Sequence, residues 1–156
     1  MQEIELVKAQ IGDEELIHKM KYDSFLPLYN HYQDTKTSPV NEPISKVISQ
    51  LKSGNCDYYI IKLDNIPVGA VRVVSEGENT FRISPLFIIP EYQNKGIGQA
   101  VLGMLFDRYN TAAKWILSTI KQEKGNCHLY EKCGFVRTGG EEIINDRMTI
   151  VYYEKI

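Results

Sequence analysis

The sequence has no apolar run that approaches the roughly 18 residues needed for a membrane-spanning helix. Its first ten residues, MQEIELVKAQ, include acidic side chains where a secretory signal peptide has a basic stretch and then an apolar core. These absences argue against a membrane partner and against export. We therefore expect a cytoplasmic protein.

Cysteine is scarce, and its spacing fits neither a disulfide framework nor a zinc site. The three cysteines, Cys56, Cys127 and Cys133, are odd in number and form no C-x-x-C pair. We expect them to be reduced thiols, and we expect no metal ion.

The chain also lacks a basic cluster. Lys and Arg total 18 against 20 Asp and Glu, the net charge is −2, and the basic residues are scattered along the sequence. Proteins that bind nucleic acids concentrate positive charge on one face. Nucleic acid is therefore not an expected partner.

What is present suffices for a folded domain. The chain has 156 residues, of which 43% are hydrophobic and 10% aromatic, enough for a sizeable core. No internal repeat, low-complexity tract or linker divides it. We predict a single domain that spans residues 1–156.

The first third of the chain alternates helical patterns with irregular stretches. Residues 3–8 alternate apolar and polar side chains and predict a strand. A helix is predicted to run from residue 14 towards Phe25, with an interruption at Pro27. The segment 29–42 fits neither helix nor strand, and we expect it to be mobile. Residues 43–52 then place apolar side chains on one helical face.

The remainder is rich in strands, and its order predicts the fold class. An antiparallel meander is followed by a helix, a strand, a short helix and a closing hairpin. The sequence therefore predicts an α/β fold with a mixed, largely antiparallel sheet flanked by helices on both faces. The predicted ranges are strands 58–63, 68–74 and 81–89, helix 97–110, strand 115–120, a helix ending at Cys133, and strands near 136–144 and 147–155.

The stretch 86–103 has the pattern of an anion-binding site. An apolar strand ends at Pro90, and a loop with Gly96 and Gly98 then leads into a helix. The first N–H groups of a helix lack partners and carry a partial positive charge, and glycine lets the backbone approach a phosphate closely.

Two motifs resemble those of a known family. The pattern Q-x-x-G-x-G, here Gln93, Gly96 and Gly98, resembles the pyrophosphate-binding signature of the GNAT superfamily of acetyl-CoA-dependent N-acetyltransferases. One helix and one strand further on, LYEKCGF at 129–135 is similar to the family's L-Y-E-K-x-G-F motif. The resemblance implies acetyl-CoA as cosubstrate and direct transfer of the acetyl group to a primary amine within a ternary complex.

The resemblance also implies which residues bind the cofactor. In the family a bulge separates two parallel strands, here 86–89 and 115–120, so that backbone groups of one strand can bind the pantetheine arm. An asparagine near the start of the later helix, here Asn126, would contact the cofactor, although its spacing to the tyrosine is shorter than usual and Asn126 also fits a simple N-cap. The loop 121–125 is an alternative source of that contact. The implied cofactor-binding residues are Phe87, Ile88, Gln93, Asn94, Lys95, Gly96, Ile97, Gly98, Gln99 and Asn126.

Tyr130 is the catalytic candidate. Family members often use this tyrosine to protonate the departing thiolate, and a phenol with a pKa near 10 is protonated at neutral pH. The alternative is a tyrosine that only packs in the core.

The general base and the acceptor stay open. The two parallel strands offer no carboxylate, which leaves Asp34, Glu42 and His31 as base candidates from the irregular segment. The acceptor is a small-molecule or peptide amine, and we expect the segment 29–42 to form a mobile wall over the thioester. A homodimer is an open alternative to a monomer. The rival function is a catalytically silent CoA-binding protein of the same fold.

Overall fold

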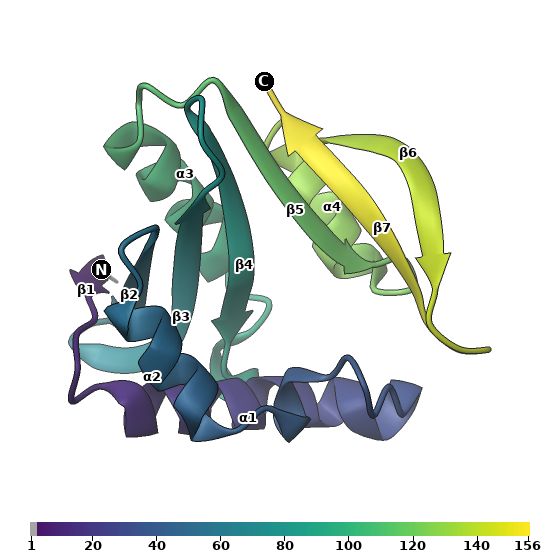
Figure 1. The fold of residues 1–156 in the computed structure, drawn as a ribbon, viewed down its shortest axis with the longest axis horizontal. Helices are drawn as coiled ribbons and strands as arrows, with labels where there is room; N and C mark the ends of the chain where they lie inside the picture. The colour runs from purple at the N-terminus through teal and green to yellow at the C-terminus, as the bar shows by residue number, and fades with distance from the viewer. Residues whose placement is uncertain (1–2) are drawn as a thin grey trace.

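The computed structural model describes residues 3–156, which form seven strands, four α-helices and two short 3-10 helices (Figure 1). The elements in chain order are β1 (Ile4–Lys8), α1 (Glu14–Tyr32), η1 (Pro39–Asn41), α2 (Ile44–Lys52), β2 (Cys56–Leu63), β3 (Ile66–Ser75), β4 (Thr80–Ile88), η2 (Pro90–Tyr92), α3 (Ile97–Arg108), β5 (Lys114–Ile120), α4 (Lys124–Lys132), β6 (Val136–Ile143) and β7 (Thr149–Lys155). No helix within this range is both long and apolar enough to cross a membrane.

The strands form one mixed sheet in the order β1-β2-β3-β4-β5-β7-β6. Every neighbouring pair is antiparallel except β4 and β5, which run parallel. A parallel pair needs a crossover connection, and α3 supplies it. The predicted fold class and the predicted strand and helix order are confirmed.

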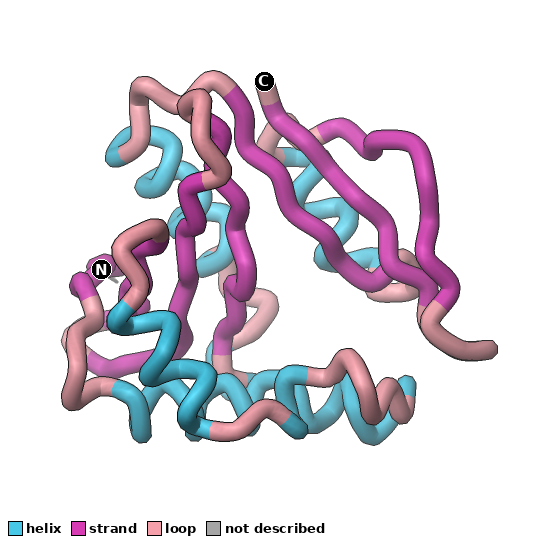
Figure 2. Tube along the Cα trace, in the orientation of Figure 1, coloured by secondary structure: helices cyan, strands magenta, loops and turns pink. Residues whose placement is uncertain are grey.

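Helices cover both faces of the sheet, as the side-chain alternation of β2 requires. Tyr59 and Ile61 face a core shared with α3 and α4, whereas Tyr58 and Ile60 face a smaller core shared with α1 and α2. Successive strand residues point to opposite faces, so a continuous apolar strand serves two cores at once. Figure 2 shows the helices grouped around the strands in this way.

A bulge in β4 changes the course of the sheet. Between flanking paired positions, β4 has two residues, Ser84 and Pro85, where β3 has the single residue Arg72. Arg72 Nε donates a hydrogen bond to Ser84 O at 2.7 Å, and Pro85 has no N–H to give to a ladder. A two-for-one step of this kind bends a strand and increases its twist.

The bend separates β4 from β5. The two strands pair only where 80–82 lies beside 114–116, and beyond that point they diverge (Figure 1). The opening lies between two parallel neighbours in the middle of the sheet. The splay that the family resemblance implied is therefore present.

The interruption predicted at Pro27 is wrong, because α1 continues through this residue to Tyr32. Contacts with distant parts of the chain hold its last turn: Asn145 Nδ2 donates to the backbone oxygen of Tyr32 at 2.9 Å, and Arg147 donates to that of His31 at 3.2 Å. These contacts offset the roughly 3 kcal/mol that an interior proline costs a helix. The segment 29–42 is consequently helical at its start, and 39–41 forms η1.

Substitution of Gly69 in β3 tests how closely the sheet is packed near the bulge, and Gly103 on α3 is the control. A Cβ at Gly69 would lie 2.1 Å from the backbone oxygen of Phe87, whereas a Cβ at Gly103 on α3 would meet nothing within 4 Å. We expect Gly69→Ala to lower the free energy of unfolding by about 3 kcal/mol, since backbone must move. Gly103→Ala should raise it by roughly 0.5–1 kcal/mol, because alanine favours the helix. Urea titration measures both, and a Gly69→Ala protein as stable as the parent would contradict the packing described.

Candidate active site

The N-terminus of α3 leaves its first amides without partners. Gly96, the N-cap, has φ 80°, and no side chain within residues 3–156 caps this helix. The first helical hydrogen bond runs from Ala100 N–H to Gly96 O at 3.2 Å, so the amides of 97–99 have no acceptor in the helix. Three free amides and the helix dipole favour an anion at this end.

The two glycines of the Q-x-x-G-x-G motif have different surroundings. A Cβ at Gly96 would meet nothing within 4 Å, but its positive φ is one that side chains rarely adopt. A Cβ at Gly98 would lie 3.1 Å from Leu129 Cδ2, so Gly98 also allows α3 to approach α4. Of these two glycines, only Gly96 combines open space with a backbone conformation that favours glycine.

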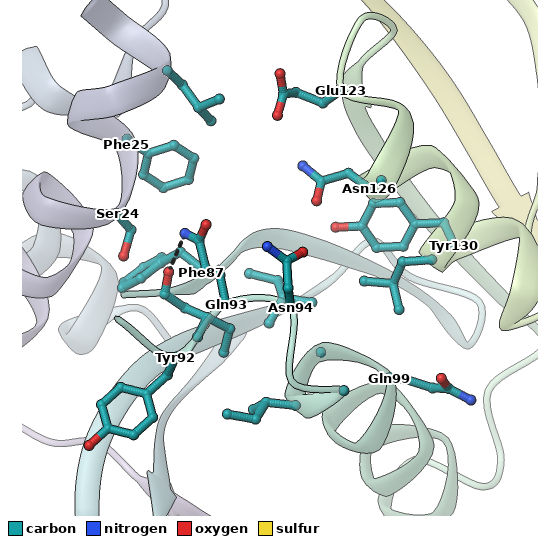
Figure 3. A pocket seen from close by; sticks show the side chains of 18 residues that line it. Ser24, Phe25, Phe87, Tyr92, Gln93, Asn94, Gln99, Glu123, Asn126 and Tyr130 are labelled. Atoms are coloured by element: carbon teal, nitrogen blue, oxygen red, sulfur yellow. Dashed lines mark hydrogen bonds between the residues drawn. The ribbon is translucent and has the colours of Figure 1, made fainter. Parts of the chain in front are cut away.

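The backbone of β4 presents polar groups to the splay. Ile89 N–H donates to Val68 O of the neighbouring segment at 2.8 Å. Backbone groups of successive strand residues point to alternate sides, so Leu86 and Ile88 face away from β3. Gln93 Nε2 donates to Ile88 O at 2.8 Å, which agrees with that direction (Figure 3).

Phe87 takes a different role from the one expected. Its backbone groups point towards β3, so they are not available to a ligand in the splay. Its side chain is buried and packs edge-on against Phe25 of α1, with 5.9 Å between ring centroids. The backbone groups that face the splay belong to Leu86 and Ile88, not to Phe87, and the Ile88 oxygen already accepts from Gln93 Nε2.

A cavity of about 320 Å³ lies between α1, the end of β4, the start of α3 and α4, and we call it the first cavity (Figure 3). Tyr130 and every predicted cofactor-binding residue line it except Lys95, which is exposed beside it. Figure 3 shows Gln99 turned away from its centre. Residues that the motifs did not indicate also line it, namely Ser24, Phe25, Leu28, Leu86, Tyr92, Glu123, Gly125 and Leu129.

Tyr130 joins the core to the first cavity. Its ring packs against Phe135 and Tyr153, with centroids 5.9 and 6.2 Å away, and its hydroxyl points into the cavity (Figure 3). Burial raises the pKa of Tyr130 to about 12. The phenol therefore stays protonated at neutral pH and faces the space where a ligand would bind.

The end of α4 fixes the turn that carries Tyr130. Gly134 has φ 97°, Phe135 N–H donates to Tyr130 O at 3.0 Å, and Gly134 N–H donates to Glu131 O at 3.1 Å. This pair of bonds is a Schellman cap. The predicted helix end at Cys133 agrees with the structure, in which Cys133 is the C-cap.

Asn126 lies inside α4, so its predicted N-cap position is wrong. The helix begins at Lys124 with Glu123 as N-cap, and Asn126 N–H donates to Glu123 O at 3.1 Å. Gly125 accepts the helical conformation, and the N-cap lies three residues earlier than the sequence suggested. The Asn126 side chain lies beside Tyr130 at the first cavity (Figure 3).

A second cavity of about 200 Å³ adjoins the first. The two share lining from α1, β4 and α4, so that Tyr130 borders both. The shared residues are Phe25, Leu28, Leu86, Asn126 and Tyr130.

The three base candidates are separated in space. Asp34 is 7% exposed and lines the second cavity, with its Oδ2 accepting a hydrogen bond from Thr37 Oγ1 at 2.8 Å. Glu42 lies instead in an ion pair with Lys46 at 2.8 Å. His31 is exposed and stacks edge-on against its neighbour in α1. Only Asp34 reaches the candidate site.

A hydrogen bond between Tyr32 and Glu123 joins the end of α1 to the start of α4. The Tyr32 hydroxyl at the end of α1 donates to Glu123 Oε2 at 2.5 Å, just before α4. Burial raises the pKa of Tyr32, and the bond to Glu123 raises it further. The two residues are 91 positions apart, so no local pattern in the sequence could indicate their pairing.

The remaining titratable groups form no candidate metal centre. Among residues 3–156, no group of three or more His, Cys, Asp or Glu side chains is placed to hold a metal ion. Cys56, Cys127 and Cys133 are free thiols.

Comparison with known proteins agrees with this geometry. The model of the acetyltransferase (GNAT) family matches residues 25–135, more than half of the chain. No curated protein matches the sequence.

Solved structures share the fold at low sequence identity. A spermidine N-acetyltransferase from Vibrio cholerae, in complex with CoA and spermine, is 18% identical with a TM-score of 0.77, over 97% of this chain and 94% of that one. An acetyltransferase from Thermus thermophilus is 15% identical with a TM-score of 0.75, over 97% and 96%. At such identities the likeness shows the fold alone, and the family match carries the assignment. The chain belongs to the GNAT acetyltransferase family, and it is an acetyl-CoA-dependent N-acetyltransferase.

Proposed function

We propose that this chain binds acetyl-CoA in the first cavity, with the thioester beside Tyr130, and that it receives a primary amine through the second cavity. The observation that supports this most directly is the meeting of the two cavities at Tyr130. Such a junction brings both substrates to one proton donor. It suits direct transfer within a ternary complex.

The pyrophosphate is assigned to the start of α3. The uncapped amides of 97–99 and the open space at Gly96 suit a phosphate group better than a neutral one. Gln93 and Asn94 precede this turn and line the same cavity. Lys95 is the least supported of the cofactor-binding residues, since it lies outside the lining.

The pantetheine arm is assigned to the exposed side of β4. An arm that carries amides can hydrogen-bond to Leu86 and Ile88 as an additional strand would. The splay supplies the width, because β5 has left this part of β4 without a neighbour. Asn126 is close enough to the cavity to contact the same arm.

The chemistry then needs few protein groups. The neutral amine nitrogen attacks the thioester carbon, a C–N bond forms and the C–S bond breaks. The thiolate takes the proton of the Tyr130 hydroxyl, the nitrogen passes one proton to the base, and Tyr130 regains its proton from solvent. Asp34 is the base candidate that lies in the acceptor cavity.

The cysteines and the edge strand β6 support proposals about location and assembly. Free cysteines suit a reducing compartment, which supports a cytoplasmic protein.

Val136 and Ile143 are 67% and 78% exposed on the edge strand β6, which supports self-association of a single-domain chain as a homodimer. Light scattering tests the assembly.

The first prediction about function concerns the pyrophosphate site. Gly96→Ala should weaken acetyl-CoA binding about tenfold, since relief of the strained φ turns the free amides away from the anion. Gly77→Ala is the matched control: Gly77 has φ 85° and open surroundings in a hairpin turn far along the chain from α3. Both variants should lose about 1–2 kcal/mol of stability, but only the first should lose affinity by calorimetry. Equal affinities would place the pyrophosphate elsewhere.

The second prediction concerns the proton donor. Tyr130→Phe keeps the packed ring and removes the hydroxyl, so kcat should fall about 10²- to 10⁴-fold while acetyl-CoA affinity is nearly unchanged. Tyr22→Phe removes an exposed hydroxyl from α1 and should leave kcat unchanged. Thiol release over a panel of amines measures the rates. A Tyr130→Phe enzyme with the parent's kcat would leave this tyrosine a packing role only.

The third prediction concerns pH. Tyr130 acts while protonated, and burial raises its pKa to about 12, so the acid form persists to higher pH than for a free phenol. At saturating substrates, kcat should therefore not decline between about pH 7 and pH 10. A decline with a midpoint near pH 10, lost in Tyr130→Phe, would show that this phenol titrates normally.

A further inference from the structure

One wall of the second cavity is apolar, whereas carboxyl, hydroxyl and amide side chains supply nearly half of its lining residues. Its sides come from α1, the bulge of β4, the end of β5 and the start of β7. At about 200 Å³ it suits a small ligand and not a folded partner. The apolar wall includes Ile83 and Pro85 of β4, and Met148 and Ile150 at the start of β7.

Asp34 is the one ionisable carboxyl group in this lining, and no Lys, Arg or His within the described residues lines it. The remaining polar lining consists of hydroxyl and amide side chains. Asp34 is 7% exposed, and its Oδ2 accepts only a neutral hydroxyl bond from Thr37. A buried carboxylate without a cation is costly, and a charged donor would relieve that cost.

The neighbouring cavities add no free carboxylate, and the carboxylate of the first cavity, Glu123, already accepts a hydrogen bond from Tyr32. A third cavity of about 340 Å³ adjoins the second at Ile83 and Ser118. Its acidic residue, Glu154, pairs with Lys114 at 3.4 Å. Its basic residue, Arg82, pairs with a glutamate at 2.8 Å, so the charges at this end are already balanced.

We propose that the acceptor is a primary amine with one positive charge on an apolar body, and that Asp34 selects it. The ammonium group lies at Asp34, and the apolar body lies against the wall formed by β4 and β7. A polyamine of the kind bound by the Vibrio cholerae protein would bring several ammonium groups to a space with one carboxylate. The inference rests on the proposed function, because it takes the second cavity as the acceptor site.

Binding to the CoA-loaded protein tests this without turnover. Calorimetry compares phenethylamine, phenethyl alcohol, which has the same ring without the charge, and spermidine. Phenethylamine should bind roughly 10- to 100-fold more tightly than the alcohol, as one buried charged hydrogen bond would give. It should also bind more tightly than spermidine. Spermidine binding as tightly as phenethylamine overturns the proposal, and so does an alcohol equal to the amine.

Substitution locates the selecting charge. Asp34→Asn keeps the shape and the acceptor for Thr37 while removing the charge, so phenethylamine should fall to the affinity of the alcohol, which itself stays unchanged. Asp146→Asn removes an exposed carboxylate from the loop between β6 and β7 and is the control for general electrostatic attraction. Unchanged phenethylamine affinity in Asp34→Asn, or an equal loss in both variants, contradicts selection by Asp34.

Rates separate this proposal from the one it rests on. If thiol release occurs with polyamines or peptides but not with phenethylamine or hexylamine, the acetyltransferase site stands and the inference about its acceptor is wrong. If acetyl-CoA binds and phenethylamine binds through Asp34, yet no amine is acetylated, the inference about binding stands and the proposed catalytic role of this junction fails.

Discussion

The pairing of β4 with β5 stops after three residue pairs, and both cavities depend on where it stops. The two-for-one step at Ser84 and Pro85 bends β4 away from its parallel neighbour. Backbone groups of Leu86 and Ile88 then face open space in the middle of a sheet, where strand groups are normally paired. A ligand with its own amides can pair with such groups, which is why we propose this side of β4 as the site of the pantetheine arm.

The long helix α1 closes the opening that the bulge creates. It crosses below the splay in Figure 1, and its last turn is tied to the opposite half of the sheet. The bond from Tyr32 to Glu123 and that from Asn145 to the Tyr32 backbone make this connection. Because the same turn leads directly to Asp34, the contacts that hold the helix past Pro27 also position the carboxylate of the second cavity.

In the proposed complex, a phosphate binds in the first cavity and an ammonium group binds in the adjoining second cavity. Uncapped amides at the start of α3 attract a phosphate, whereas Asp34 attracts an ammonium group. Tyr130 lies between them as a neutral phenol, with its ring held by core contacts and its turn held by the Gly134 cap. The two substrates therefore need not compete for the same charged groups, which suits a ternary complex.

The sequence alone determined the order of elements, the fold class and the motif residues at the start of α3 and on α4. Those features depend on local hydrogen bonding and on the period with which apolar side chains recur. Both are set by residues that lie close together in the sequence. Tertiary structure decided the rest: α1 runs through Pro27, the free backbone belongs to Leu86 instead of Phe87, and α4 begins before Asn126. It also decided that Asp34, and not Glu42 or His31, reaches the site. These outcomes depend on contacts between residues far apart in the chain, whose energies outweigh local preference and leave no periodic trace in the sequence.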